Sequence, residues 1–455
     1  MILELYVMDV DVVRSILRQT TYFHLHYNKS KKYNVVFDKL KEVVGCGVDK
    51  ELWCLVTNTA RALKQQAQYM RIPKDKDVYI GNKQSISFRK MSRMLDVLCE
   101  QGFLVFYKGG FINVKQQKYI SSQYQITTKY KELWEGVDIE EDLGYDGDLI
   151  EIKCRDTKDK LNAKIRGTAS IRALVESYNK SLCDVQLVLD NNPIPVQQYK
   201  RVFSGNLDLG GRFYNVVGGV QTMKQEDRKR LMINGENVVE LDFKALHPSI
   251  LYEKVWQEQP ELVEGWIERA WDGVYNPYIT KGSEVLFDLD NDEIAEHIEK
   301  YGLHKYNPIR NLFKFAVMAS LNAKRGVKRP MLPAASALTQ EWYDDKNKPQ
   351  KDKKYVGLYP KGDKFPSLDL CELVVAANKP IAEHFCSDVG VKLQRIDSDI
   401  IEKVIQQLLE DGEVLYPEHD SVIVRESIEH RVTQLMRQAY FDVIGSDQFC
   451  VVEKK

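Results

Sequence analysis

Two apolar runs of strand character, far apart in the chain, each carry an aspartate at one end. Residues 240–252 read ELDFKALHPSILY, and residues 418–424 read EHDSVIV. An aspartate at the tip of a buried strand is costly unless a cation meets it there. Either run alone is more typical of a cap or a turn. Together they favour a pair of divalent metals at Asp242 and Asp420, because hard carboxylate oxygens suit Mg²⁺ and two such ions can clamp a phosphoryl displacement.

The segment between these runs predicts a helix with a chemical face. Asn307 and Pro308 form a good helix start, with a side-chain cap followed by proline at the first helical position. A spacing of four then places two cations, a thioether and an amide on one face, at Arg310, Lys314, Met318 and Asn322. Such a face can neutralise and orient a triphosphate while metals hold its other side. The alternative is a solvated basic helix.

The N-terminal third predicts a module of its own. Residues 85–101 have the apolar spacing of an amphipathic helix, which ends at Gly102. The polar face of this helix carries three cations, Arg89, Lys90 and Arg93.

Two further runs, 103–107 and 111–114, follow that helix and give a β-hairpin signal around Lys108-Gly109-Gly110. With residues 52–69 as a preceding helical region, this order resembles a winged helix-turn-helix. The resemblance implies duplex DNA contacts by the three cations of the helix. Because the same fold also serves protein–protein contacts, both functions stay open.

The stretch between the N-terminal module and the first aspartate is less regular. Residues 140–148 are acidic and contain glycine, which predicts a boundary or a solvated loop. Residues 158–190 have helical core spacing, and their cations could follow a duplex backbone, although a solvated face is the commoner explanation. Residues 344–354, rich in Asp and Lys, predict an exposed loop.

Composition restricts where nucleic acid could bind. The chain has 455 residues, 44% of them hydrophobic and 29% charged, with a net charge of −1, so it is long enough for two or three domains. Phosphate contacts must therefore come from local basic patches. The eight cysteines show no Cys-x-x-Cys spacing, which favours reduced thiols in the cytoplasm. No run approaches the roughly 20 apolar residues of a membrane span.

Several motifs resemble the family A polymerase superfamily, which includes the single-subunit RNA polymerases. The spacing of Arg310, Lys314 and Asn322-Ala323 is similar to its second motif, which normally ends in Tyr-Gly. Asp242 and the His419-Asp420 pair resemble its first and third motifs. Ordered agreement across several motifs is far more specific than any one of them.

The resemblance extends on both sides of these motifs. Upstream, Arg212, Gln221 and Arg228 or Arg230 fall in the order of the segment that grips the primer–template minor groove. Downstream, residues 398–412 are similar to the helix that leads into the third motif. In all, the likeness covers roughly residues 205–440, about half of the chain.

Three departures from the family concern the sugar of the nucleotide. His247 stands where DNA polymerases of the family usually carry Glu and where a similar family B motif carries Tyr. The proline after it, Pro248, predicts a turn that fixes the local chain direction. It could exclude the 2′-hydroxyl by bulk or bind it, and these give opposite preferences. Asn322 replaces a tyrosine that touches the sugar, and Ser421 matches RNA polymerases. Choice of sugar therefore stays open.

The resemblance implies a role for each site residue. Asp242 and Asp420, with the backbone carbonyl of Phe243, would bind two Mg²⁺ ions, or Mn²⁺. Lys314 and Arg310 would be catalytic through the phosphates, with Lys314 also able to protonate the leaving group. Met318, Asn322 and His247 would contact the incoming nucleotide. Contacts to DNA are expected from Arg212, Gln221, Arg228 and His419 and, in the N-terminal module, from Arg89, Lys90 and Arg93.

We therefore expect an α+β chain with a winged-helix-like domain at 1–125, a linker and helical thumb-like segment at 126–200, and a right-hand palm at 201–455 with helical fingers at about 255–385. The expected function is a template-directed DNA polymerase without proofreading, which acts on primer–template and nucleoside triphosphates, possesses no membrane segment and works with replication proteins. The alternatives are a single-subunit RNA polymerase or primase, and a non-enzymatic DNA-binding replication initiator or regulator.

Overall fold

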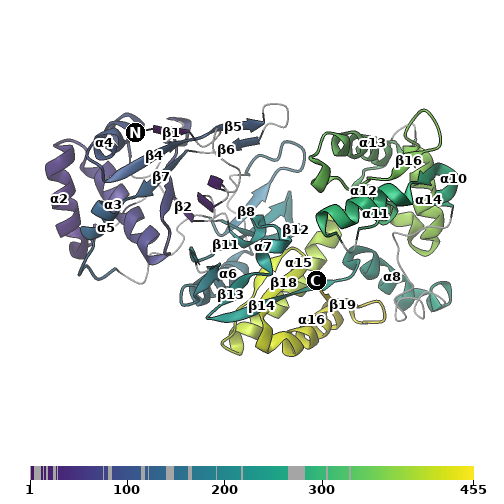
Figure 1. The fold of residues 1–455 in the computed structure, drawn as a ribbon. Coiled ribbons are helices and arrows are strands. Elements are labelled where there is room, and N and C mark those ends of the chain that lie inside the picture. Colours follow the sequence, from purple (N-terminus) through teal and green to yellow (C-terminus); the bar gives the residue numbers. More distant parts are fainter. Residues whose placement is uncertain are drawn as a thin grey trace.

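The chain folds into helices and several sheets arranged around two large hydrophobic cores (Figure 1). This computed structural model describes residues 2–4, 12–13, 15–16, 19–23, 27, 29–74, 76–79, 85–113, 118–120, 122–139, 148–161, 167–190, 192–216, 219–264, 282–303, 306–326 and 329–455. The smaller core runs from Phe23 to Trp134 and the larger from Leu149 to Cys450. The cores thus divide between residues 134 and 149, whereas the sequence suggests boundaries at 125 and 200.

The N-terminal module contains a sheet with the strand order β1-β4-β7-β3-β2, and helices α3 and α4 contact its strands. Its elements are β1 (Ile2–Glu4), β2 (Thr20–Tyr22), η2 (Lys31–Tyr33), α2 (Asn34–Val44), α3 (Asp49–Lys64), β3 (Tyr69–Arg71), η3 (Lys76–Tyr79), α4 (Phe88–Glu100), β4 (Leu104–Lys108), β5 (Gly110–Asn113), β6 (Lys118–Ile120), β7 (Gln123–Ile126) and α5 (Thr128–Glu132). In Figure 1 this module lies at the opposite side of the molecule from α11 and α14.

The predicted amphipathic helix of this module is confirmed as α4. Ser87 caps its N-terminus by accepting a hydrogen bond from the backbone of Lys90, and Gly102 follows its end with a φ of 76°. Met91 and Leu95 of the predicted apolar face are buried in the core.

The predicted hairpin, in contrast, is wrong in its pairing. Strand β4 pairs with β7, and β5 pairs with β6, so the runs 103–107 and 111–114 are not partners. An apolar run indicates a strand, but the partner is chosen by tertiary packing. In addition, α3 ends at Lys64, and β3 and η3 separate it from α4, so the helix-turn-helix designation is not confirmed.

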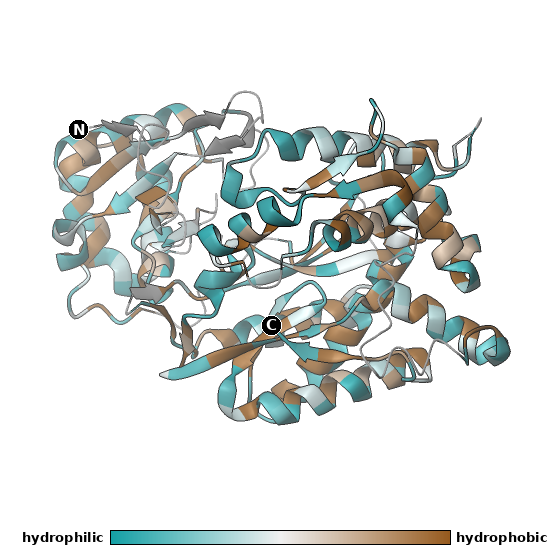
Figure 2. Ribbon diagram, turned by 45° about the vertical axis from the view of Figure 1, so that its right-hand side comes forward, coloured by the Kyte–Doolittle hydropathy of each residue, from teal (hydrophilic) through white to brown (hydrophobic). Residues whose placement is uncertain are grey.

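The larger core contains an antiparallel sheet with the strand order β10-β9-β13-β14-β18-β17, and β19 pairs with β14. The elements from its first part are β8 (Ile150–Lys153), α6 (Ala169–Leu182), β9 (Leu187–Leu189), β10 (Asn192–Ile194), β11 (Tyr199–Ser204), β12 (Asn206–Asn215), η4 (Val220–Thr222), α7 (Gln225–Arg228), β13 (Leu231–Ile233) and β14 (Glu236–Phe243). Those from its last part are α15 (Gly390–Glu410), β17 (Tyr416–Glu418), β18 (Ser421–Arg425), η8 (Glu426–Ile428), α16 (Glu429–Ile444) and β19 (Val452–Lys454). The strands of this sheet carry hydrophobic colouring in Figure 2, as burial between packed layers requires.

A helical region is inserted between β14 and α15. Its described elements are α8 (Leu246–Glu258), η5 (Pro260–Leu262), α10 (Ser283–Leu286), β15 (Phe287–Leu289), α11 (Asn291–Tyr301), α12 (Pro308–Asn322), α13 (Leu332–Lys346), η6 (Gln350–Asp352), β16 (Leu358–Pro360), α14 (Ser367–Ala377) and η7 (Lys379–His384). The predicted start of α12 is confirmed, because the Asn307 side chain accepts from the Arg310 backbone at 2.9 Å and Pro308 opens the helix.

Three local predictions need correction. Among the described residues of the range 158–190, the expected helix is found as α6, and residues 187–189 form strand β9 instead. The expected loop at 344–354 begins inside α13, and buried Asp345 anchors it by accepting backbone hydrogen bonds. The turn after Asp242 lies at Ala245, which has a φ of 52°, and not at Pro248, which lies in the first turn of α8.

Other predictions about the chain as a whole concern membranes and thiols. Within the described ranges, no helix has both the length and the apolar content needed to cross a membrane. None of the eight cysteines, all of which lie in the described ranges, forms a disulfide bond. Residues 140–147, the centre of the predicted acidic loop, lie outside the described part of the chain.

A buried arginine of strand β11, Arg201, connects helix α15 to strand β12. Arg201 is fully buried and forms an ion pair with Glu402 of α15. It also donates to the Ser398 hydroxyl at 2.7 Å and to the Gly211 carbonyl at 2.6 Å. A buried charge is tolerated only when it is paired and hydrogen-bonded in this way.

Arg201→Met is expected to lower the free energy of unfolding by about 3 to 5 kcal/mol, because Glu402 loses its partner inside the protein. Urea denaturation measures this value. Arg230→Met provides the control: Arg230 is about half exposed and pairs with Asp227 and Asp190, so its loss should cost less than about 1 kcal/mol. Equal and small losses in both variants would contradict the structural role of Arg201.

Candidate active site

Main-chain pairing brings the two predicted aspartates together. Asp242 lies opposite Ser421 in the antiparallel pair of β14 and β18, so Asp420 is the next residue along. The backbone N–H of Phe243 donates to the Asp420 carbonyl at 3.3 Å. Asp420 occupies a two-residue turn between β17 and β18, in which His419 has a φ of 60°. The predicted juxtaposition of the β14 strand and the β17–β18 hairpin is therefore confirmed.

The Asp242 carboxylate carries an unfavourable charge. Burial and the neighbouring Asp420 raise its pKa to about 6 from an ordinary value of 3.8. Lys455 and Lys314 act against this rise. Because Lys314 belongs to α12, its effect shows that the cationic helix and the strand aspartates share one electrostatic site.

Lys455 is the nearest cation to Asp242. Its ammonium lies 2.9 Å from Asp242 Oδ1 and 3.2 Å from Glu240 Oε1. Burial alone would favour a neutral lysine, but these two carboxylates outweigh it and raise the pKa of Lys455. Asp242 Oδ1 is buried and accepts no hydrogen bond of regular geometry. Its contact with a donor group is the ion pair with Lys455.

Two glutamates flank the aspartates on the same strands. Glu240 is buried and accepts from both ends of the Arg228 guanidinium at 2.9 and 3.0 Å, and from the Ser421 hydroxyl at 3.1 Å. Burial raises the pKa of Glu418 to about 7. Glu418 Oε2 is buried and lacks a hydrogen-bond partner.

The face of α12 predicted to bind the nucleotide stays out of the core. Lys314 and Asn322 are exposed, and Arg310 and Met318 are partly exposed. The core side consists of other positions: Pro308, Leu312, Phe313, Ala316, Val317, Ser320 and Leu321. The amide of Asn322 donates to the Met318 carbonyl at 2.8 Å. The helix thus presents the four predicted residues together, while their contacts to a nucleotide stay predictions.

Arg212 and His247 meet at a residue that the sequence did not single out. Asp397 of α15 is fully buried and accepts from Arg212 Nε at 3.1 and 3.2 Å. It also lies 2.8 Å from His247 Nε2. Since a carboxylate only accepts, this bond places a proton on Nε2. His247 Nδ1 is buried without a hydrogen-bond partner.

The remaining predicted DNA contacts of the palm hold the protein together in this structure. Both hydrogens of the Gln221 amide are donated, to the Phe213 carbonyl at 3.0 Å and the Pro417 carbonyl at 2.8 Å. Arg228 is bound to Glu240. Burial lowers the pKa of His419, whose ring lies 6.0 Å from that of Tyr214. Contact of these residues with DNA stays a prediction. To bind DNA, Gln221 and Arg228 would have to break the bonds that they form within the protein.

The basic residues of the N-terminal helix are solvent-accessible. Arg89, Lys90 and Arg93 of α4 are exposed. Arg89 and Arg93 border a shallow hollow that Asp96 and Glu100 also line. Because this hollow carries both cations and carboxylates, it favours neither DNA binding nor protein binding by the N-terminal module.

The aspartate pair has donors that fit magnesium. Among the described residues, no three His, Cys, Asp or Glu side chains are grouped to hold a metal ion. Mg²⁺ usually keeps several waters and binds through one or two carboxylates together with substrate phosphates. Asp242 and Asp420 provide that number, and the partly unsatisfied Asp242 oxygen is the group a cation would relieve. Mg²⁺ at this position would have to displace the Lys455 ammonium.

Asp397 and Lys455 are the two site residues that sequence reasoning missed. Asp397 lies in the segment QRIDSDIIEK, where it is an aspartate on the apolar face of the helix. That position is the signal that could have identified it, because a buried carboxylate requires a partner. Lys455 has no comparable signal, since its contacts depend on the pairing of β19 with β14.

Comparison with protein-family models and with curated proteins gives no match. Among solved structures, one similar chain is the POL domain of Pol1 from M. smegmatis in complex with DNA primer-template and dNTP. It has 12% sequence identity and a TM-score of 0.29, and the alignment covers 98% of this chain and 69% of that chain. An overlap this weak carries no argument about function, and the polymerase resemblance stays a prediction.

Asp242→Asn is expected to stabilise the protein above pH 6. The folded pKa of about 6 exceeds the ordinary 3.8, so the wild type loses stability as pH rises between these values and Asp242 ionises. The amide avoids this cost and leaves Lys455 paired with Glu240. We expect a gain of about 1 to 2 kcal/mol at pH 7 that largely disappears at pH 4.

Urea denaturation at several pH values measures this gain. Asp208→Asn is the control, since Asp208 is exposed on β12, and its difference from the wild type should not follow pH in this way. A variant that is less stable than the wild type at pH 7 would show that Asp242 is not under charge strain.

Proposed function

We propose that this chain is a template-directed nucleotidyltransferase that extends a nucleic-acid primer, and most specifically a DNA polymerase without proofreading. The observation that carries the proposal is the joint placement of Asp242 and Asp420 by strand pairing. Burial and the neighbouring Asp420 raise the pKa of Asp242, and Lys314 of α12 acts on the same carboxylate. Perturbed carboxylates that face helix-borne cations suit the binding of metal and phosphate.

Asp242, Asp420 and the Phe243 carbonyl would hold the metal ions. When bound, Mg²⁺ supplies Lewis acidity to the primer 3′-hydroxyl and charge neutralisation to the triphosphate. Arg310 and Lys314 bind the phosphates from the opposite side, and Lys314 can give a proton to the departing pyrophosphate. Met318 packs under the incoming base. Arg212, fixed by Asp397, and His419 lie at the primer end.

His247 and Asn322 govern the choice of sugar in this proposal. His247 is held by Asp397 and its ring is buried, so it acts by occupying space more readily than by offering a free donor. We therefore favour exclusion of the 2′-hydroxyl, and hence deoxynucleotides. Ser421, which donates to Glu240 at 3.1 Å, is shared with RNA polymerases, so incorporation of ribonucleotides is the direct test.

The N-terminal module complements the polymerase core. Exposed Arg89, Lys90 and Arg93 would add phosphate contacts to duplex DNA outside the palm. A non-enzymatic initiator that binds DNA through this module is the competing proposal, and it requires no activity from the aspartates.

Asp420→Asn is expected to abolish primer extension, because the amide keeps the size of the side chain but loses the charge that holds the metals. Lys314→Ala is expected to slow the chemical step by about 10² to 10³, as for a lost oxyanion donor. Single-turnover extension of a primed template with dNTP and Mg²⁺ measures both rates.

Lys403→Ala is the matched control for Lys314→Ala. Lys403 is exposed on α15 and lies 3.8 Å from Asp442, so the rate should stay near that of the wild type. Thermal melts establish that each variant is folded. Full extension by folded Asp420→Asn protein would reject the proposed site, and absence of extension by the wild type on primed and unprimed templates would favour the initiator.

His247→Ala is expected to reduce the ratio of kcat/KM for dNTP over rNTP by admitting ribonucleotides, with little loss of dNTP use. His247→Gln serves as a partner variant, because its amide can still donate to Asp397 while the ring is gone. If the ring acts by bulk, discrimination should fall in both variants. A selective loss of rNTP use would instead assign His247 to binding the 2′-hydroxyl, and an unchanged ratio would remove it from the sugar site.

A further inference from the structure

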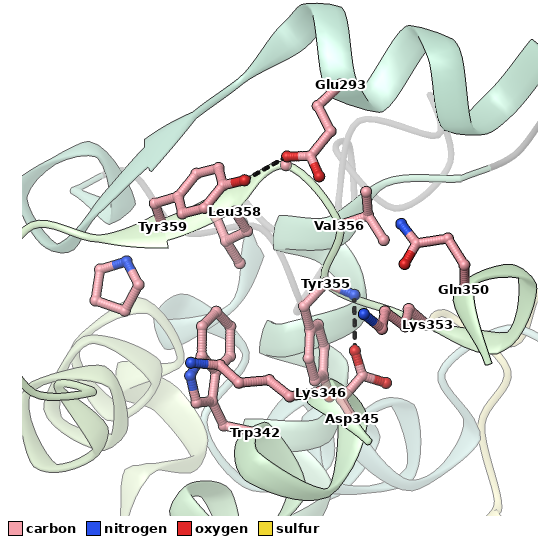
Figure 3. A pocket seen from close by; sticks show the side chains of 12 residues that line it. Glu293, Trp342, Asp345, Lys346, Gln350, Lys353, Tyr355, Val356, Leu358 and Tyr359 are labelled. Carbon is pink, nitrogen blue, oxygen red and sulfur yellow. Dashed lines mark hydrogen bonds between the residues drawn. The ribbon is translucent and has the colours of Figure 1, made fainter. Parts of the chain in front are cut away.

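A second recess lies in the inserted helical region, away from the aspartates. It has a volume of about 220 Å³ and lies among α11, the C-terminal part of α13 and strand β16 (Figure 3). The residues relevant to its chemistry are Glu293, Trp342, Asp345, Lys346, Lys353 and Tyr359. Pockets for complete drug-sized ligands are roughly 300–1,000 Å³, so a recess of this size suits one unit of a longer ligand.

The walls of this recess are rigid. Trp342 is stacked between Tyr355, at 5.5 Å and 18°, and Phe365, at 4.7 Å and 15°. Gly357 has a φ of 75° and packs on Ile294, where an added Cβ would approach to 2.5 Å. A fixed aromatic wall lowers the entropy cost of binding, because little must be ordered when a ligand enters.

The carboxylates of the recess are occupied by internal bonds. Asp345 accepts from the backbone N–H groups of Lys354 at 3.0 Å and Tyr355 at 3.2 Å, and from Lys348 at 3.1 Å. Glu293 accepts from the Tyr359 hydroxyl at 2.5 Å, as Figure 3 shows. These bonds satisfy the acidic groups and hold Tyr359, whose residue is 50% exposed.

The lysines of the recess, in contrast, are available to an anion. Neither Lys346 nor Lys353 forms an ion pair within the part of the chain that the structure describes. Lys346 lies over the Trp342 ring at 5.6 Å. The surrounding segment, residues 344–364, contains seven lysines against four aspartates. The same recess is lined by the exposed ring of Tyr359. Cations and an exposed ring together provide contacts for both the phosphates and the bases of an unpaired strand.

The recess is connected to the proposed active site by α12. Asn311 of that helix donates to the Lys354 carbonyl at 3.3 Å, and Tyr306, just before it, accepts from the Val356 backbone at 2.6 Å. Figure 1 shows α12 between α13 and α15, and α12 contacts both helices. A strand that leaves the palm past α12 would therefore meet this recess.

We propose that this recess binds one unpaired nucleotide of a single-stranded nucleic acid, with its base against Tyr359 and its flanking phosphates on Lys346 and Lys353. The inference rests on the proposed function for the identity of the strand as template. The chemistry recognised, a base with phosphates, also exists in free nucleotides. A strand is favoured because the two lysines can bind successive phosphates.

The test is binding of a fluorescent single-stranded oligodeoxythymidylate to the full chain, without triphosphate and with EDTA. Tyr359→Leu is expected to weaken affinity by about tenfold, in line with the loss of one stacked base. Replacing Lys346 and Lys353 together by Gln is expected to reduce the log–log salt slope by about 1.4, since each phosphate contact on a single strand contributes about 0.7.

Phe441→Leu is the matched control, because Phe441 is 46% exposed and lies on α16, outside the recess. A 4-thiothymidine oligonucleotide should crosslink to the peptide that contains Tyr359 in the wild type and not in Tyr359→Leu. Unchanged affinity and slope in both recess variants, with crosslinks elsewhere, would overturn the proposal. So would competition by free thymidine monophosphate at the concentration at which the oligonucleotide competes.

These measurements separate the two proposals, since they need neither metal nor catalysis. Binding at the recess in a protein without extension activity would leave the inference intact and reject only the polymerase. Extension activity without recess binding would do the reverse. The lysine variant changes only polar side chains at the surface, so it tests the recess even if Tyr359→Leu reduces stability.

Discussion

The pairing of β14 with β18 forces Asp242 and Asp420 to be neighbours, and much of the surrounding structure compensates for that constraint. Burial of the Asp242 carboxylate, together with repulsion from the neighbouring Asp420, raises the pKa of Asp242 to about 6. The compensating cations come from distant parts of the chain: Lys455 follows β19, and Lys314 lies on α12. Strand pairing thus brings the two carboxylates together, and cations from distant parts of the chain offset their repulsion.

Helix α15 carries the second set of buried charges and connects this site to the inserted helices. Within little more than one turn, Asp397, Ser398 and Glu402 bind Arg212 and Arg201 of the neighbouring strands. The segment just before α15 is hydrogen-bonded to the end of α12. The backbone N–H groups of Cys386 and Asp388 donate to the carbonyls of Ser320 and Ala323. The cations of α12 are therefore positioned relative to Asp242 by a buried polar network, and the directional hydrogen bonds of that network restrict how the two parts can shift.

Sequence patterns correctly predicted the helix ends that depend on residues close together in the chain. Asn307 and Pro308 predicted the start of α12, and Gly102 predicted the end of α4, because capping depends on neighbours in sequence. The same reasoning failed for the strand that returns to β4, since several apolar runs of equal character compete and only packing selects among them. Asp397 escaped notice for a related reason: its partners Arg212 and His247 lie 185 and 150 positions away, so no spacing rule could connect them.

The aspartate site and the lysine-lined recess differ in the partners of their carboxylates. At the aspartate site, Asp242 keeps a buried oxygen without an aligned hydrogen bond, and the Lys455 ammonium lies 2.9 Å from it. In the recess, Asp345 and Glu293 are satisfied by backbone groups, Lys348 and Tyr359, so it is the remaining lysines that require a counter-ion. The carboxylate of the first site is thus paired with a cation of the protein, whereas Lys346 and Lys353 of the recess have no carboxylate partner among the described residues. Helix α12 connects the two sites, because the charge of Lys314 acts on Asp242 and Asn311 donates to the Lys354 carbonyl at the wall of the recess.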